Sequence, residues 1–422
     1  MNPIGGDALS SLWAALACLL VFSRVLALLA SRVGAPPIVG ALLAGVLLNH
    51  EVLGSLWPAA QHWLFPGTSS SAHLLGGITN LCLLFVCFLL GIETDVVELR
   101  KLGRRLPLAA AWTFVLPFAA GAGIAVWASQ GMIGRSGSEL ALVLLLGTAT
   151  AVSSLPVIAW MVRGLDLAAR WPGRLAVGVA TAQDAAGFVL LAVAVAVTSG
   201  GGAVRLLTVV LGFAALAGVL LFGGRPVGFL LARTSSRDRE AGAGALTVAF
   251  ATMLIFAAAS QSAHISGALG AFVAGVMVSR SAVARTALIT SVEAIIAGVF
   301  VPVYFASAGV SLQFRLVTSG GAAIALAALV VFGFAAKAVA EAISARGLGR
   351  RPGERPLFAT LLNGRGTLQV LIASVALRNG IITDVGYSVI VTAALLTSLL
   401  VAPLARSFTR ATTSSKRAAV EL

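Results

Sequence analysis

Residues 180–187 read A-T-A-Q-D-A-A-G and lie inside an apolar run that extends from about residue 173 to residue 199. A helix of about 20 apolar residues is long enough to cross the hydrocarbon core of a bilayer. Asp184 therefore places a carboxylate where hydrocarbon is expected, at an insertion cost of about 2.5–3.5 kcal/mol. Because intramembrane acids mark ion and proton pathways, Asp184 is the first candidate functional residue.

The composition identifies the class of protein. The chain has 422 residues, of which 59% are hydrophobic and 10% are charged, whereas a soluble domain has about 25% charged residues. These values predict an all-α, multi-pass membrane protein. The net charge of +14 comes from basic residues dispersed through short loops, so we expect membrane lipid rather than nucleic acid as a partner. The sequence shows neither a nucleophile–base pair nor a metal-ligand cluster, so we expect no enzyme and no bound cofactor.

Apolar runs bounded by charges or by Gly and Pro define thirteen predicted transmembrane spans, the second and ninth of which are short. In chain order they are 9–30, 36–49, 73–92, 107–129, 139–162, 173–199, 205–232, 241–262, 265–279, 290–311, 319–343, 356–378 and 383–406.

The distribution of basic residues orients these spans. The loops after the odd-numbered spans, with the C-terminal segment, hold 23 Lys and Arg residues, and the N-terminus with the alternate loops holds 4. Because cytoplasmic loops carry the excess of Lys and Arg, the N-terminus is predicted outside and residues 407–422 form a short cytoplasmic tail. Merging spans 8 and 9 would reverse this alternation, so thirteen spans stand.

The two short spans carry similar sequences. Residues 40–48 read G-A-L-L-A-G-V-L-L and residues 270–278 read G-A-F-V-A-G-V-M-V. Span 2 and span 9 are seven spans apart, and an odd offset reverses direction through the bilayer. The sequence therefore predicts an inverted-topology repeat, as in secondary transporters with a midplane site. The alternative is chance recurrence of small apolar residues.

Lys337 in span 11 and Arg365 in span 12 share the depth of Asp184. All three lie about 14–16 Å from the cytoplasmic ends of their helices at 1.5 Å per residue. This is near the middle of a hydrocarbon core about 30 Å thick. One acid and two bases at one depth predict a functional site, and the alternative is a buried ion network that only fixes helix packing.

Two spans carry helix-breaking sequences at the same depth. Residues 148–156 read T-A-T-A-V-S-S-L-P, from Thr148 to Pro156, and residues 363–367 read N-G-R-G-T. Pro removes a backbone donor and Gly permits non-helical dihedrals, so both helices are predicted to unwind there and to expose carbonyls to a cation. The alternative is two kinks whose Ser and Thr hydroxyls bond back to their own helices. The second break is predicted at Asn363, Gly364 and Gly366.

Five segments together resemble the monovalent cation:proton antiporter-2 family, the sodium/hydrogen exchanger type that includes Kef-like potassium exporters. The resemblance runs over about residues 9–406. The segments are G-A-P-P-I-V-G-A-L-L-A-G-V-L-L-N-H-E-V-L-G (34–54), L-L-F-V-C-F-L-L-G-I-E-T-D (83–95), S-S-L-P-V-I-A-W-M-V (153–162), G-A-L-G-A-F-V-A-G-V-M (267–277) and N-G-R-G-T-L-Q-V-L-I-A (363–373).

The resemblance implies a dimeric elevator-type transporter within residues 1–406. Spans 1–3 and 8–10 would form the scaffold, and spans 4–6 and 11–13 would form the ion-carrying core. Asp184 falls on the ion-binding aspartate of the family, and Lys337 falls on its lysine. The sequence departs from the family at Gln183, where an acid is common, and at Gln369, where an acid follows the arginine. Lys337 is therefore expected to lack its usual carboxylate partner.

The sequence thus predicts exchange of K⁺ or Na⁺ for protons across the cytoplasmic membrane. Asp184 would bind a proton or a cation in turn, so that one proton crosses per cation and no net charge moves. The further cation ligands are expected among Gln183, Thr150, Ser153 and Ser154. Two alternatives remain open: a sensor that has kept the fold without transport, and an organic-anion symporter with Arg365 as the substrate clamp.

Overall fold

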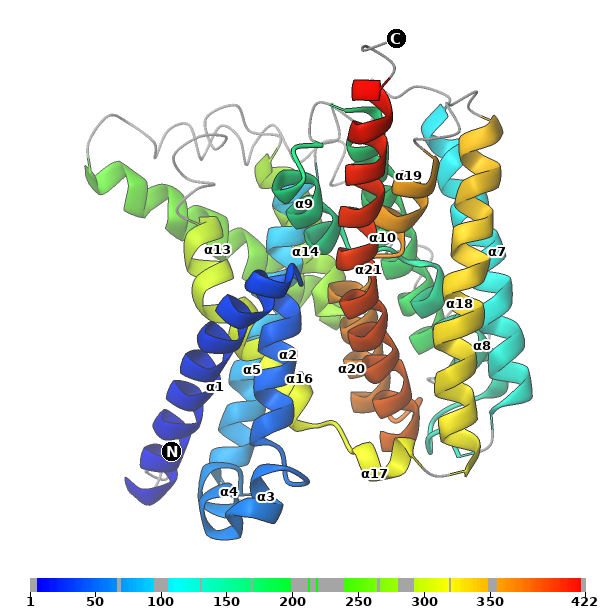
Figure 1. Ribbon diagram of the computed structural model, residues 1–422. Helices are drawn as coiled ribbons and strands as arrows, with labels where there is room; N and C mark the ends of the chain where they lie inside the picture. The colour runs from blue at the N-terminus through cyan, green and yellow to red at the C-terminus, as the bar shows by residue number, and fades with distance from the viewer. Residues whose placement is uncertain are drawn as a thin grey trace. The chain divides into compact units, whose positions relative to one another are not determined.

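Helices make up the part of the chain that the computed structural model describes (Figure 1). The described residues are 6–66, 70–94, 105–129, 131–167, 170–198, 212, 218, 239–263, 266–279, 292–318, 320–347 and 355–418. Within them, β-structure is limited to an isolated antiparallel bridge between Ile133 and Ile382. The predicted all-α class is therefore confirmed for the described part of the chain.

The described helices follow the predicted spans. Their bounds are α1 (Gly6–Val33), α2 (Pro37–Leu48), α3 (Leu53–Leu56), α4 (Pro58–Leu64), α5 (Ser70–Glu93), α7 (Arg105–Trp127), α8 (Glu139–Ala151), α9 (Leu155–Gly164), α10 (Trp171–Thr198), α13 (Arg239–Ser262), α14 (Gly267–Ser279), the π-helix η1 (Ile296–Phe300), α16 (Val301–Val310), α17 (Phe314–Val317), α18 (Gly320–Gly347), α19 (Arg355–Leu362), α20 (Thr367–Arg378) and α21 (Asp384–Ala418).

In the described ranges, 10 helical segments are long and apolar enough to cross a membrane, which confirms a multi-pass membrane protein. Predicted span 9 is the shorter apolar helix α14, and predicted span 12 is divided between α19 and α20. Predicted span 7, residues 205–232, lies outside the described residues except at positions 212 and 218. The count of thirteen spans and the orientation of the termini stay predictions.

The chain divides into two compact units. The first comprises Met1–Ser23, Leu47–Val97 and Ser199–Ser307, and the second comprises Arg24–Val46, Glu98–Thr198 and Ala308–Leu422. The second unit contains the helices of predicted spans 4–6 and 11–13, together with part of span 2, which the resemblance assigned to the scaffold. Asp184, Lys337 and Arg365 therefore belong to one unit.

Both predicted helix breaks are present in the second unit. α8 ends at Ala151 and α9 begins at Leu155, with Val152 and Ser154 in extended conformation (ψ 140° and 110°). Pro156 lies in the first turn of α9, where its missing N–H costs no hydrogen bond. α19 likewise ends before the residues 363–366, and α20 begins after them.

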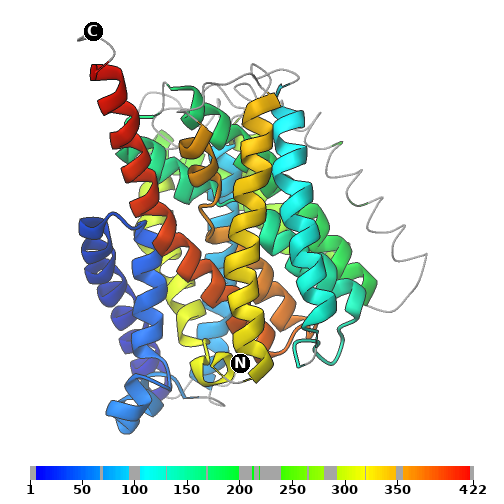
Figure 2. The same cartoon turned by 45° about the vertical axis from the view of Figure 1, so that its right-hand side comes forward.

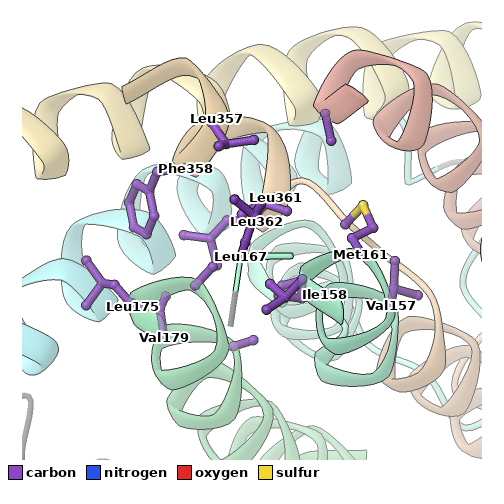
Figure 3. Close-up of a cluster of buried hydrophobic side chains, with 14 of the residues drawn as sticks. Val157, Ile158, Met161, Leu167, Leu175, Val179, Leu357, Phe358, Leu361 and Leu362 are labelled. Atoms are coloured by element: carbon purple, nitrogen blue, oxygen red, sulfur yellow. The ribbon is translucent and has the colours of Figure 1, made fainter. Parts of the chain in front are cut away.

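The half-helices α9 and α19 pack against α10 through a cluster of buried apolar side chains (Figure 3). Ile158 and Met161 of α9, Leu175 of α10 and Phe358 and Leu361 of α19 are each at most 2% exposed. On the other side of the second unit, α7 and α18 run side by side (Figures 1 and 2). This packing fixes one end of each broken helix beside the helix that carries Asp184.

One close backbone approach recurs at matched positions of the predicted halves. In the first unit, Gly91 of α5 packs on Gly275 of α14, and a Cβ on either residue would lie about 2.9 Å from the Cα of the other. In the second unit, a Cβ on Gly309 of α16 would lie 2.9 Å from the Cα of Gly45 in α2. Gly45 and Gly275 hold the same place in the two similar sequences, so this match supports the predicted repeat.

Two loops of the second unit are joined by main-chain hydrogen bonds. The loop before α8 donates from Gly134 N to Ile381 O and from Ser136 N to Gly380 O, both at 2.9 Å. The loop before α21 donates in return from Thr383 N to Met132 O, at 3.0 Å. These bonds tie together the ends of α8 and α20 that lie away from the helix breaks.

Candidate functional site

The two helix breaks contact each other and form the centre of the candidate site. Ser154 N donates to Gly364 O at 2.7 Å, and Thr367 N donates to Ser154 Oγ at 3.2 Å. Ser153 Oγ lies 2.7 Å from Leu362 O, a hydrogen-bonding distance for its single proton. The breaks are therefore a crossing of two unwound segments that satisfy part of each other's backbone.

Asp184 lies on α10 against this crossing. Its side chain is 2% exposed, and it interacts electrostatically with Lys337. One turn further on, Gly187 faces the first break and the start of α20, because a Cβ there would approach Val152 Cγ1 to 2.9 Å and Leu368 Cδ2 to 2.6 Å. The lack of a side chain at Gly187 thus allows α10 to approach the crossing at the level of Asp184.

Gln183 connects three helices through its amide. Its Oε1 accepts from Ser153 N at 3.1 Å and lies 2.7 Å from Ser153 Oγ and 3.5 Å from Lys337 Nζ. Its Nε2 donates to Thr113 Oγ1 of α7 at 3.0 Å. The amide oxygen therefore faces the crossing, and the amide nitrogen faces away from it.

Lys337 is fully buried, and its ammonium donates to Ala151 O at the C-terminus of α8. A cation is favoured at this end of a helix because the unpaired carbonyls carry partial negative charge. Glu341, also fully buried, lies one turn further along α18 and attracts both Lys337 and Arg365. Asn363 Nδ2 donates to Glu341 Oε2 at 3.3 Å, which links α18 to the second break.

Lys337 thus lacks the usual acids at positions 183 and 369, but another carboxylate, that of Glu341, attracts it. Glu341 falls near the end of predicted span 319–343, where an acid is readily assigned to the membrane surface. The structure buries it completely because α18 continues to Gly347 and Glu341 shares the face of Lys337. The sequence feature that could have revealed this pair is the spacing of four residues, which places Lys337 and Glu341 on the same face of a helix. Gln369, the other position at which the sequence has an amide in place of an acid, donates from Nε2 to Ile390 O at 3.3 Å.

Arg365 is fully buried between α8 and α18. A Cβ on Gly333 would lie 3.0 Å from its Nη2 and 3.0 Å from Thr150 Cγ2, so the glycine provides the space for the guanidinium. Among the described residues, none of the three guanidinium nitrogens has a hydrogen-bond partner. Its backbone carbonyl accepts from Ser398 Oγ of α21.

The predicted polar residues of α8 behave differently from those of the break. Thr148 Oγ1 donates to Leu144 O at 2.6 Å and Thr150 Oγ1 donates to Leu146 O at 2.7 Å, so both hydroxyls bond back to their own helix. Their lone pairs remain able to accept or to bind a cation. Ser153 and Ser154, by contrast, join the network of the crossing.

A family model described as "Sodium/hydrogen exchanger, transmembrane" matches residues 18–407. The chain belongs to the sodium/hydrogen exchanger family. It is 25% identical over 383 residues to the Na(+)/H(+) antiporter NhaS4 of Synechocystis, which covers 90% of this chain and 93% of that protein. It is 26% identical over 390 residues to Cation/H(+) antiporter 19 of Arabidopsis thaliana, covering 91% of this chain. The chain spans about half the length of that plant relative, since the match covers 48% of it.

The exchanger-family fold is also found among solved structures. The sodium proton antiporter MjNhaP1 from Methanocaldococcus jannaschii at pH 8 matches with a TM-score of 0.68. The match covers 95% of this chain and 98% of that one, at 15% sequence identity. At that identity the likeness establishes the fold alone.

In this member of the exchanger family, the structure brings together Asp184, Gln183, Ser153 and Lys337, all of which the sequence singled out. It adds Glu341 and Thr113, which the sequence analysis missed. With Asp184, Lys337 and Arg365, Glu341 completes a buried group of two acids and two bases in the described part of the second unit. Such a group carries no net charge when every member is ionised.

Proposed function

We propose that this chain exchanges K⁺ or Na⁺ for protons across the cytoplasmic membrane. Membership of the sodium/hydrogen exchanger family supports cation/proton antiport, and the relatives' names state Na⁺/H⁺ and cation/H⁺ antiport for those proteins. The observation that carries the proposal is the position of Asp184, buried in a membrane-spanning helix against the crossing of two broken helices.

Asp184 binds either a proton or the cation, and the two compete for its carboxylate. A dehydrated cation needs several oxygen ligands, and the crossing offers them within the same unit. Gln183 Oε1 and the Ser153 and Ser154 hydroxyls lie in the hydrogen-bonded network, and Thr150 lies one turn away on α8. In this scheme only the loaded carboxylate, carrying either the proton or the cation, crosses the membrane.

The exchange is electroneutral in this scheme. The two acids and two bases balance when Asp184 is empty and ionised, and either a proton or a monovalent cation then adds one positive charge. The loaded core has the same net charge in both directions, so one proton exchanges for one cation. This scheme requires that Lys337 does not exchange its own proton; its ammonium donates to Ala151 O and lies 3.5 Å from Gln183 Oε1.

The remaining parts of the proposal concern the whole assembly. The second unit acts as the moving core of an elevator, two copies form a homodimer, and thirteen spans place the N-terminus outside. The inverted repeat is supported by the matched Gly91–Gly275 and Gly309–Gly45 approaches. The grouping of α7–α10 with α18–α21 in one compact unit supports the division into core and scaffold.

The test is proton movement in proteoliposomes that carry an imposed pH gradient. Na⁺ or K⁺ is added to vesicles containing the wild type or Asp184→Asn, and dequenching of a pH-sensitive dye is followed. Cation-triggered dequenching in the wild type that disappears in Asp184→Asn supports the proposal and identifies the ion. Absence of a response to both cations in folded wild-type protein refutes antiport and leaves the non-transporting sensor and the organic-anion symporter.

Organic-anion symport remains a second candidate because of Arg365. Its guanidinium nitrogens have no hydrogen-bond partner among the described residues, and they would suit a carboxylate ligand. This alternative predicts uptake of a labelled carboxylate that disappears in Arg365→Met, with no proton release on adding a cation. Antiport predicts the opposite pair of results in the same vesicles.

A further inference from the structure

Thr113 lies on α7, away from the two helix breaks, and its side chain is completely buried. Its hydroxyl donates to Ala109 O at 2.7 Å, with Ala110 O at 3.3 Å as a second acceptor in the same turn. A threonine hydroxyl has a single proton. The oxygen that Thr113 presents to Gln183 can therefore only accept a hydrogen bond.

This acceptor determines which way the Gln183 amide is turned. The NH₂ group must face Thr113, and Nε2 donates to Thr113 Oγ1 at 3.0 Å. On the other side the amide meets two groups that can only donate, Ser153 N and Lys337 Nζ. Ser153 Oγ, whose single proton Gln183 Oε1 shares with Leu362 O, lies 2.7 Å away. The reversed amide would place its NH₂ against an ammonium and a backbone N–H, and its carbonyl against the Thr113 lone pairs.

We propose that Thr113 is a positioning residue that holds the carbonyl oxygen of Gln183 toward the crossing, next to Asp184, and thereby sets the affinity for the transported cation. An amide held in this way presents the negative end of its dipole to a cation. An amide that can rotate also presents its NH₂ group, which repels one. The inference rests on the proposed antiport and adds to it a residue that lies outside the broken helices.

The test compares Thr113→Val, which has the same shape but cannot accept, with Thr113→Ser, which keeps the hydroxyl. Thr397 supplies a matched control because it is also fully buried and bonds only to its own helix in the described part, to Ala393 O at 2.7 Å and Ala394 O at 3.1 Å. Thr113→Val is expected to raise the cation concentration for half-maximal exchange by about 2–10-fold, the loss of one buried hydrogen bond. Thr113→Ser and Thr397→Val are expected to stay near the wild type, with maximal rates unchanged.

Cation binding is measured independently, from the rise in melting temperature of the detergent-solubilised protein with cation concentration. This measurement separates the proposed antiport from the role of Thr113 in cation affinity. If the wild type binds a cation without exchanging it, antiport fails, and the role of Thr113 is judged from the binding midpoints of the variants. If the wild type does neither, both fail.

A Gln183→Ala background shows whether Thr113 acts through Gln183. Since no amide remains to be oriented, adding Thr113→Val is expected to shift the binding midpoint no further. A shift that persists in this background, or one no larger in Thr113→Val than in Thr397→Val, overturns the inference.

Discussion

At the scale of single residues, Glu341 is the side chain on which the buried charges most depend. It lies beside Lys337 and Arg365 and is fully buried. Glu341→Ala leaves two buried cations opposite Asp184 alone, and we expect it to destabilise the fold by about 3–5 kcal/mol. The loss is measured as a fall in the melting temperature of the purified protein.

Two further variants test the cause of that loss. Lys337→Met combined with Glu341→Met removes one charge of each sign, so the double variant should melt well above Glu341→Ala. Glu139→Gln, at the exposed start of α8, should melt close to the wild type. If Glu341→Ala melts no lower than Glu139→Gln, Glu341 does not compensate the buried cations.

The sequence predicted Asp184, Lys337 and Arg365 because a charge inside a long apolar run is conspicuous. Glu341 was missed because the estimated span ended too close to it, although its spacing from Lys337 was visible. Thr113 carried no such signal. A buried threonine in an apolar helix usually bonds back to its own turn, as Thr397 does, and only the approach of α10 to α7 makes Thr113 an acceptor for Gln183.

At the scale of helices, the contact between α5 and α14 leaves no room for a side chain. A Cβ on Gly91 would collide with the backbone of Phe272 and Gly275, whereas a Cβ on Gly77 of the same helix meets open space. Gly91→Ala is therefore expected to destabilise the protein by about 1–3 kcal/mol, and Gly77→Ala to be neutral or stabilising. Melting temperatures of the two variants check this. Equal melting temperatures of Gly91→Ala and Gly77→Ala would show that α5 and α14 can move apart at little cost in stability.

The helix breaks were predictable because Pro156 and the glycines of residues 363–367 act locally. What the sequence could not determine is how the hydroxyls of the first break are used. The structure keeps Thr148 and Thr150 bonded to α8 and directs Ser153 and Ser154 across to the second break. That difference depends on the segment that lies opposite, which is about 210 residues away in the sequence.

At the scale of the whole molecule, a single carboxylate that binds either one proton or one monovalent cation predicts electroneutral exchange. With no membrane potential and one proton exchanged per cation, a tenfold cation gradient should be balanced by a pH difference of about one unit, with the more acidic solution on the side that holds more cation. Proteoliposomes with fixed cation ratios and varied pH locate the point of zero net proton flux. Balance at about half a pH unit instead would mean two protons per cation and a second titrating group.

The number of spans and the direction of the chain depend on loop charges, many of which belong to segments outside the described residues, such as 219–238 and 280–291. Composition alone sufficed for the class of protein and for the helices with long apolar runs. The division into two units could not be obtained in this way, because it depends on contacts between helices far apart in the chain.

The hydrogen bonds between the loops before α8 and α21 restrict how this sequence can evolve. They use main-chain atoms of Gly134, Ser136 and Thr383, so a side chain that makes no further contact can change without loss of these bonds. The glycines are exceptions, because a Cβ on Gly134 or Gly137 would lie 2.3 or 2.2 Å from a carbonyl oxygen of the other loop, and Gly380 has a φ of +66° that disfavours other residues. An inserted or deleted residue, in contrast, would put every donor out of step with its acceptor. Among homologues, these two loops should therefore vary in sequence while keeping their lengths.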